Sequence, residues 1–250
     1  MSPLGKHIVS VIIPCRNEEA SIANVLRGFN KGMLGKDSFY FDLIVIDNNS
    51  TDNTAKIAKQ AGARVVKEPR KGKGNAMRTG FRNIDPTAEY VVMIDGDDTY
   101  RPEEVMRLLE PIHNDFCDVV VGSRLGGKIH GEAMNAVNRG GNWLYTHLVR
   151  IVYSLNVTDV LSGYFAWKRE VIDELEPHLH AGGFAIEMEM ITKMSKMHLR
   201  VYSVPISYHQ RRGLSNLRPI HDGVRIMHTF SKNIRWHYPH RVEDLEEEVQ

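Results

Sequence analysis

The sequence predicts an α/β protein in which helices flank a mostly parallel open sheet within a single domain. In the first half of the chain, five short β-branched apolar runs alternate with helical stretches. Continuous apolar runs are typical of strands covered on both faces, and the alternation favours parallel strands with right-handed crossovers. The chain has 250 residues, of which 42% are hydrophobic, and this is enough for one large core.

The elements can be assigned in order along the chain. Strands are expected at 7–14, 42–47, 63–67, 90–95 and 118–123. Helices between them are expected at about 19–29, 52–61, 73–83 and 102–114, the last opening on a proline and two acids, as helices often do. In the less regular second half we expect helices at 135–155, 184–197 and 219–236 and strands at 163–168 and 199–206. The domain should span residues 1–240, followed by an acidic, disordered tail at 241–250.

Composition narrows the class of protein. Lys plus Arg number 32 and Asp plus Glu 31, so the net charge of +1 gives no general argument for nucleic-acid binding. The two cysteines, Cys15 and Cys117, cannot build a disulfide framework and suit a reducing compartment. No apolar run reaches the ~18 residues of a membrane-spanning helix, and the N-terminus does not resemble a signal peptide. We therefore expect a cytoplasmic protein.

Charged side chains follow three predicted strands. Pro14 is followed by Arg16 and Glu18, the second strand ends at Asp47, and the fourth ends in the run Asp95–Asp98. Ligands of open α/β sheets bind at these carboxyl ends. Adjacent carboxylates repel unless a cation joins them, and such oxygen ligands suit Mg²⁺ or Mn²⁺ together with a substrate phosphate. The run predicts a metal site, with a solvated acidic turn as the alternative.

A basic loop at 67–75 lies between these acids in the sequence. It carries four bases, Lys73 among them, and two glycines just before a predicted helix, a pattern that can wrap an anion. Neither a Walker motif nor GxGxxG is present. Considered by itself, this segment could be an ordinary solvent-exposed loop with no ligand. Together with the acidic strand ends it predicts a diphosphate site where metal and bases share the negative charge.

Seven segments, taken in order, resemble a known family. They are SVIIPCRNEE, VIDNNSTDNT, EPRKGKGNAMRTGF, YVVMIDGDDTYRPE, VVGSR, DVLSGYFAWKRE and FAIEMEM. Over about residues 8–235 they are similar to family-2 glycosyltransferases of the GT-A (Rossmann-like) fold, above all to the dolichyl-phosphate (polyprenyl-phosphate) mannose and glucose synthases. The resemblance implies an inverting, metal-dependent enzyme. It would move a hexose from GDP-mannose, UDP-glucose or UDP-GlcNAc to dolichyl or polyprenyl phosphate.

The resemblance also implies roles for residues. The donor would be bound by Pro14, Arg16, Glu18, Asp47, Lys73, Asp95 and Gly96. The metal, Mg²⁺ or Mn²⁺, would be held by Asp95 and Asp97, with Thr99 where mannose enzymes carry glutamine. The acceptor phosphate would contact Arg124, Arg139, Arg212 and Ser215, and the catalytic group would comprise these three arginines and Asp97. Further matches to the family's D-x-x-S/C-G segment and following helix are Asp159, Ser162, Gly163 and Glu189.

Three departures from the family pattern leave the donor open. Asn48-Asn49 replaces Asp-Gly after the second strand, Cys15-Arg16 replaces the usual residues after Pro14, and Ser215-Asn216 replaces Ser-Lys. We interpret Cys15 itself as structural.

The chemistry of the acceptor decides which residues are needed. A metal at the two aspartates would neutralise the leaving diphosphate. A hydroxyl acceptor would require a general base, for which Asp159 or Glu189 are the candidates. A lipid phosphate, with a second pKa of roughly 6, is already anionic and needs only arginines to hold it. A single inverting displacement is expected because no residue stands out as a covalent nucleophile.

A polyprenyl acceptor requires contact with a membrane. The predicted helices at 137–155 and 219–236 have apolar faces, bases and the interface-prone Trp143 and Trp236. Packing on the domain core is the alternative for both. We expect peripheral association at the cytoplasmic face, direct or through a membrane-anchored partner. Two other functions stay open: the same chemistry on a soluble phosphate (phosphoglycerate) or a glycan, and a non-catalytic subunit of a membrane glycosyltransferase complex.

Overall fold

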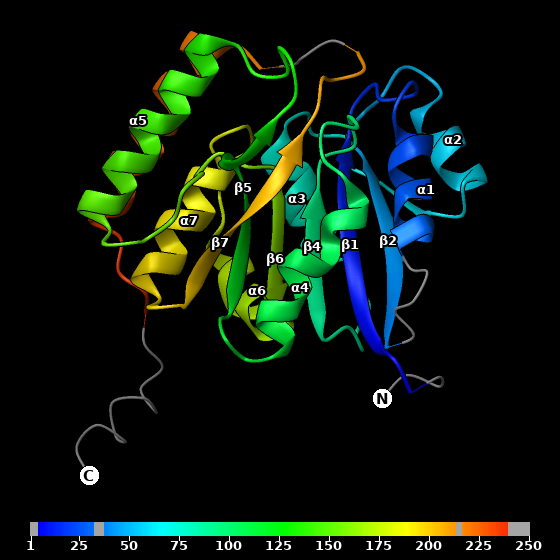
Figure 1. Cartoon of the computed structure of the whole chain (residues 1–250), viewed down its shortest axis with the longest axis horizontal. Helices are drawn as coiled ribbons and strands as arrows, with labels where there is room; N and C mark the ends of the chain where they lie inside the picture. The colour runs from blue at the N-terminus through cyan, green and yellow to red at the C-terminus, as the bar shows by residue number, and fades with distance from the viewer. Residues whose placement is uncertain (1–4, 33–37, 214–216, 240–250) are drawn as a thin grey trace.

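A seven-stranded sheet in the order β3-β2-β1-β4-β6-β5-β7 organises the computed structural model, which describes residues 5–32, 38–213 and 217–239 (Figure 1). The strands are β1 His7–Cys15, β2 Phe39–Asp47, β3 Arg64–Lys67, β4 Tyr90–Ile94, β5 Val119–Ile129, β6 Tyr164–Lys168 and β7 Val201–Tyr208. Strand β6 runs antiparallel to β4 and β5, whereas the other neighbouring pairs are parallel. The predicted α/β architecture with a mostly parallel open sheet is confirmed.

Helices cover both faces of the sheet (Figure 1). They are α1 Ile22–Gly32, α2 Thr54–Gln60, α3 Lys73–Phe81, α4 Val105–His113, α5 Ala136–Val152, α6 Arg169–Leu175, α7 Ile186–Lys196 and α8 Pro219–Ile234. Along β1, Val9 and Val11 join the core under α1, α2 and α4, whereas Ile12 points into the opposite core with α3, α6 and α7. Successive strand side chains alternate between faces, so continuous apolar runs fill both cores.

Three elements differ most from the prediction, and the other bounds shift by up to three residues. The helix expected at 102–114 opens with a 3₁₀ turn, Pro102–Glu104, before α4 begins. The strand expected at 118–123 continues to Ile129, with an irregularity between Ser123 and Lys128 where it pairs with β7. Helix α6 was not predicted, because its seven residues directly follow β6 and are too few to show a helical period.

Helices α5 and α8 form a pair on the α7 side of the molecule. The Tyr145 hydroxyl donates to the Gly223 carbonyl at 2.9 Å, and the Tyr153 hydroxyl donates to the Phe230 carbonyl at 2.5 Å. Their inner side chains join the core, including Val149. Their outer faces carry exposed apolar side chains, namely Val137, Trp143, Leu144, Ile151, Val152, Ile220, Val224 and Ile234. Each helix therefore both packs on the core and presents an apolar face.

The chain after α8 turns back onto the domain. The Trp236 ring is half-buried, 5.6 Å from the His178 ring, and the Lys193 ammonium lies 5.3 Å from its centroid. Trp236 therefore packs against other parts of the protein while staying partly exposed, and its place at a membrane interface stays a prediction. Within the three described ranges, no helix is both long and apolar enough to cross a membrane. The acidic tail at 241–250 lies outside the described residues.

Candidate active site

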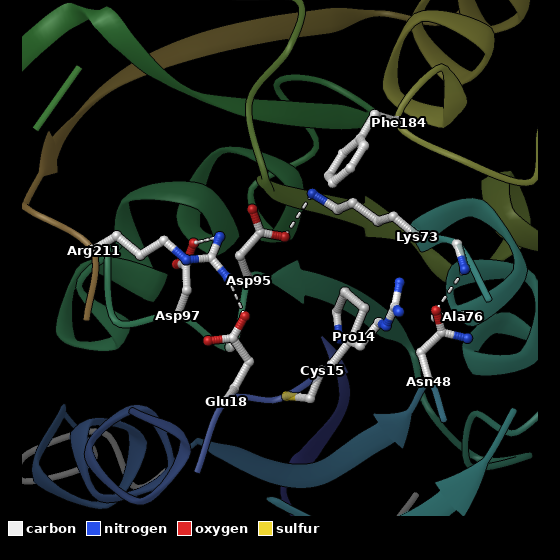
Figure 2. A pocket seen from close by; sticks show the side chains of 13 residues that line it. Pro14, Cys15, Glu18, Asn48, Lys73, Ala76, Asp95, Asp97, Phe184 and Arg211 are labelled. Atoms are coloured by element: carbon white, nitrogen blue, oxygen red, sulfur yellow. Dashed lines mark hydrogen bonds and ion pairs between the residues drawn. The ribbon is translucent and has the colours of Figure 1, made fainter. Parts of the chain in front are cut away.

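A pocket opens at the carboxyl ends of β1, β2 and β4 (Figure 2). Its empty volume is about 660 Å³, open solvent at the mouth included. Its lining residues are Pro14, Cys15, Arg16, Glu18, Asn48, Gly72, Lys73, Ala76, Asp95, Gly96, Asp97, Phe184 and Arg211. All the predicted donor residues except Asp47 are therefore brought together, along with Asp97.

The turn after β4 presents the two carboxylates predicted to hold a metal. Asp98, in this turn, adopts φ 63°, in the left-handed region. The backbone N–H of Thr99 donates to Asp97 Oδ1 at 3.2 Å and the Thr99 hydroxyl donates to the same oxygen at 2.6 Å. Burial, and after it Asp95, raise the pKa of Asp97 above its usual value. Thr99 thus orients Asp97 from behind.

Lys73 neutralises Asp95 from the first turn of α3. Its Nζ lies 2.6 Å from Asp95 Oδ1 and 2.6 Å from Glu187 Oε1 of α7. Burial alone would lower the pKa of Lys73, but the negative charges of Asp95 and Glu187 raise it by more. The net pKa is above its usual value, so the ammonium is charged. Burial also raises the pKa of Glu187, and the second Glu187 oxygen, Oε2, has no hydrogen-bond partner among the described residues.

Arg211, which follows β7, neutralises the other side of the pocket. Its guanidinium donates to Asp97 Oδ2 at 2.9 Å and to Glu18 Oε1 (Figure 2). Burial raises the pKa of Glu18 to about 8, against the lowering effect of Arg211. Lys73 and Arg211 therefore each bridge two carboxylates, one pair including Asp95 and the other Asp97.

Asn48 shapes the basic loop, and its amide explains one departure from the family pattern. Its Nδ2 donates to the Glu68 and Arg70 carbonyls at 3.2 and 2.8 Å, and its Oδ1 accepts the Gly72 N–H at 2.7 Å. A carboxylate in this position could not donate to two carbonyls. Asp47, one residue earlier, is buried, accepts the Ser50 N–H at 3.1 Å and does not line the pocket.

The basic loop also depends on Glu68, whose change should lower stability. Glu68 accepts hydrogen bonds from Arg70 Nε and Nη2 at 3.0 and 2.8 Å and from the Thr79 hydroxyl at 2.5 Å. These bonds lower the pKa of Glu68 to about 2, and those from the Arg70 side chain have the largest effect. We expect Glu68→Gln to reduce the free energy of unfolding by about 1–3 kcal/mol at pH 7, as lost charged hydrogen bonds do. Denaturant unfolding of both proteins measures this.

The difference in unfolding free energy between wild type and Glu68→Gln should depend on pH, in a direction set by the lowered pKa of Glu68. A folded-state pKa below the unfolded value of 4.5 stabilises the fold above pH 4.5, and this contribution is lost as the pH falls toward 2. The gap between wild type and Glu68→Gln should therefore shrink over that interval. A gap that stays constant would show that the carboxylate charge does not act in this way.

The predicted acceptor residues occupy different environments. Arg124 is buried, with Nε and Nη2 donating to the two oxygens of Asp159 at 2.7 and 2.8 Å. Arg139 is exposed on α5, and the Arg212 side chain is 59% exposed, with Nε 3.0 Å from Asp98 Oδ2. Ser215 lies outside the described residues. Of the four, Arg212 is closest in sequence to the pocket lining.

Neither candidate general base lines the pocket. Asp159 is fully buried and is held by Arg124 and by Asn142 Nδ2 at 2.6 Å. Glu189 accepts the N–H groups of His180 and Ala181 and pairs with Lys193 at 2.7 Å. The helix acid that reaches the site network is instead Glu187, since residues two apart on a helix point to different sides.

Cys15 forms part of the pocket wall beneath Gly96. A Cβ at Gly96 would lie 2.3 Å from its Sγ, and burial raises the pKa of the thiol well above its usual value. A thiol kept protonated is inert. The structure adds Ala76 and Phe184 to the pocket lining, gives Asn48 and Arg211 contacts there that the sequence did not predict, and brings in Glu187 as the second partner of Lys73.

The donor set at Asp95 and Asp97 suits a divalent cation held jointly with a substrate. No group of three or more His, Cys, Asp or Glu side chains in the described ranges is arranged as a complete metal site. Mg²⁺-type ions are commonly bound by one or two carboxylates, with phosphate oxygens and water completing the shell. The two aspartates fit this arrangement, and the cations beside them show that the pair requires positive charge.

This fold, with paired acids and bases around a pocket at the strand ends, agrees with the GT-A glycosyltransferase class that the sequence motifs resemble. The chain belongs to glycosyl transferase family 2, whose sequence profile matches residues 10–176. It is 35% identical over 217 residues to glycosyltransferase AglJ of Haloferax volcanii, covering 86% of this chain and 68% of AglJ. It is 30% identical to the dolichyl-phosphate hexose transferase of the same organism, over 87% of this chain and 90% of that protein.

A solved structure shows the same fold. Glucosyl-3-phosphoglycerate synthase from Mycobacterium tuberculosis, in complex with Mn²⁺, UDP and glucosyl-3-phosphoglycerate, superposes with a TM-score of 0.70. The match covers 91% of this chain and 80% of that one, at 23% sequence identity. At this identity the likeness concerns the fold.

Proposed function

We propose that this glycosyltransferase transfers a hexose from a nucleotide sugar to dolichyl or polyprenyl phosphate, with inversion and with the help of Mg²⁺ or Mn²⁺. The observation that carries the proposal is the pocket in which Asp95 and Asp97 each meet a cation at the end of β4. A relative named dolichyl-phosphate hexose transferase, matched over nearly its whole length, supports the acceptor. The complex of the structural neighbour with Mn²⁺ and UDP supports the donor class and the metal.

The donor would lie along the ends of β1 and β4. Arg16 lines the pocket and is partly exposed, so its guanidinium can donate to the nucleotide. Pro14, Glu18 and Gly96 would shape the same wall, and Lys73 would share the charge of the diphosphate. Asp47 would act from behind the wall by holding the turn at Ser50.

The metal would be held by Asp95 and Asp97 and would neutralise the leaving nucleoside diphosphate. Thr99 is proposed to serve the metal by donating its hydroxyl to Asp97, which fixes the orientation of that carboxylate. The protein itself would contribute preorganised charge. Its carboxylates and bases are in place before the substrate binds, and such preorganised charge is the main source of electrostatic catalysis.

A phosphate acceptor suits the side chains around the pocket. Because the phosphate is anionic near neutral pH, no side chain has to deprotonate it. This agrees with the buried, ion-paired states of Asp159 and Glu189. Arg212 is exposed beside the pocket residue Arg211 and is the most direct candidate for binding the acceptor. Arg124 and Arg139 would contribute from β5 and α5, and Ser215 remains a prediction.

A lipid acceptor would be collected at a membrane surface. The exposed apolar faces of α5 and α8 lie among exposed bases, namely Arg139, Arg150, Arg218, Arg225, Lys232 and Arg235. An apolar stripe bordered by bases is typical of helices that lie in a membrane interface. We propose peripheral binding at the cytoplasmic face, directly through these helices or with the help of a membrane partner.

A transfer assay tests the function. Purified protein with Mg²⁺ and Mn²⁺ would be given radiolabelled UDP-glucose, UDP-GlcNAc or GDP-mannose, each with and without a short polyprenyl phosphate. We expect one donor to pass its label to the organic phase only when the lipid is present. Donor breakdown without lipid product would indicate a soluble acceptor, and absence of donor binding would indicate a non-catalytic subunit.

Removal of the metal should abolish this transfer. We expect a chelator to inhibit by at least about 100-fold, as loss of a main electrostatic contributor does, and either Mg²⁺ or Mn²⁺ to restore the rate. The rate of label transfer before and after readdition measures this. Full activity in excess chelator would contradict the role of the two aspartates.

A further inference from the structure

Both oxygens of the Asp97 carboxylate are occupied by protein donors. Oδ1 accepts the Thr99 hydroxyl at 2.6 Å and its N–H at 3.2 Å, and Oδ2 accepts Arg211 Nη1 at 2.9 Å. A cation that binds Asp97 from the pocket therefore meets the Arg211 guanidinium on Oδ2. Thr99 belongs to the same turn and cannot leave, whereas Arg211 reaches across from the segment after β7.

Arg211 is held by charge and is incompletely satisfied. Its other terminal nitrogen contacts Glu18, and its buried Nε has no hydrogen-bond partner among the described residues. The side chain is 25% exposed, whereas that of Lys73 on the opposite side is 11% exposed and retains Glu187 as a second partner at 2.6 Å. Of the two bridging cations, Arg211 is therefore the one that can be displaced toward solvent.

We propose that Arg211 is the resident counter-ion of the metal site, and that a divalent cation takes its place on Asp97. The inference rests on the metal site of the proposed function. Neighbouring carboxylates need a cation in either state, so the guanidinium and the metal alternate. The displaced guanidinium then stays at the pocket beside Arg212, where the phosphate groups of the substrates need positive charge. Metal binding thereby releases a phosphate-binding group.

The exchange can be tested without any turnover by titrating the full chain with Mn²⁺ alone, in about 0.15 M salt, and measuring binding by electron paramagnetic resonance. We expect Arg211→Gln to bind Mn²⁺ about tenfold more tightly than wild type, or more, within the range of coupling between competing ligands. The matched control Arg212→Gln removes the same charge one residue away. Because Arg212 is exposed and its charge is screened by solvent and salt, this substitution should change the Mn²⁺ affinity by less than about threefold.

A second variant protects the test against a folding defect. Arg211→Lys keeps the charge, but its single ammonium cannot span Asp97 and Glu18 as the fork of a guanidinium does, so its Mn²⁺ affinity should lie between those of wild type and Arg211→Gln. Asp95→Asn should weaken Mn²⁺ binding in every background.

The outcomes separate this inference from the proposed function. Equal Mn²⁺ affinity in wild type, Arg211→Lys and Arg211→Gln, lost in Asp95→Asn, would overturn the exchange and keep the metal site. Weaker binding in Arg211→Gln would likewise overturn the exchange. If Arg211→Gln binds no Mn²⁺ at millimolar concentration, the exchange is overturned, and the chelator experiment then decides separately whether transfer needs a metal.

Discussion

Replacement of Asp97 by asparagine should reduce glycosyl transfer by about 10³-fold while leaving the protein folded. The loss has an electrostatic cause, because Asp97 is one of two carboxylates proposed to hold the cation that neutralises the leaving group, and removal of one preorganised contributor typically costs about 10²–10³ in rate. Asparagine keeps an oxygen that can accept the Thr99 hydroxyl, which now binds Asp97 at 2.6 Å. The initial rate of label transfer to the lipid measures the effect.

The stability of Asp97→Asn should stay close to that of wild type. Burial and Asp95 raise the pKa of Asp97, so the fold disfavours the ionised carboxylate relative to the unfolded chain. A neutral side chain of the same shape removes that cost, and this offsets the loss of the hydrogen bond from Arg211 Nη1, which the amide nitrogen in place of Oδ2 cannot accept. We expect a Tm within about 3 °C of wild type, equivalent to roughly 1 kcal/mol in a chain of this size.

Asp118→Asn is the matched control. Asp118 accepts Arg200 Nη2 at 2.7 Å and the Lys168 ammonium at 3.0 Å, just before β5 begins, and it does not line the pocket. This change should lower the Tm and leave the transfer rate per folded molecule unaltered. The reverse pattern, an unfolded Asp97→Asn or an inactive Asp118→Asn, would contradict the assignment of Asp97.

The sheet could be predicted because its signal is local. Each of the five strands expected in the first half is present, since a strand buried on both faces must be apolar at consecutive positions. The orientation of β6 could not be predicted: its apolar run reads alike in either direction, and it inserts antiparallel between β4 and β5, which are distant in sequence.

The candidate site divides in the same way. Asp95 and Asp97 were predictable because they directly follow a strand, where an open sheet binds its ligands. Glu187 and Arg211 reach the site through contacts that each span 114 residues, from Lys73 to Glu187 and from Asp97 to Arg211. The sequence shows no pattern for such contacts, and it favoured Glu189, whose carboxylate instead caps the chain at 180–181.

The segment before β6 provides the second test with a large effect, Gly163→Ala. A Cβ at Gly163 would lie 2.0 Å from Asp95 Oδ2 and 2.5 Å from its Cγ, far inside contact distance. The carboxylate cannot simply rotate away, because its other oxygen is fixed 2.6 Å from Lys73. Asp95 must therefore shift as a whole. Since displacements of about 1 Å at a reacting centre cost about 10² in rate, we expect a loss of that order in lipid-dependent transfer.

The cause of that loss can be separated from general destabilisation. Gly140→Ala on α5 is the control: its Cβ meets no atom within 4 Å, and alanine in a helix should raise stability by up to about 1 kcal/mol. Gly163→Ala should lower both the Tm and the Mn²⁺ affinity, and the rate should stay low at temperatures where the variant is fully folded. A folded Gly163→Ala with the wild-type rate would show that the position of Asp95 is not critical. The proposed metal site would then lose one of its two carboxylates.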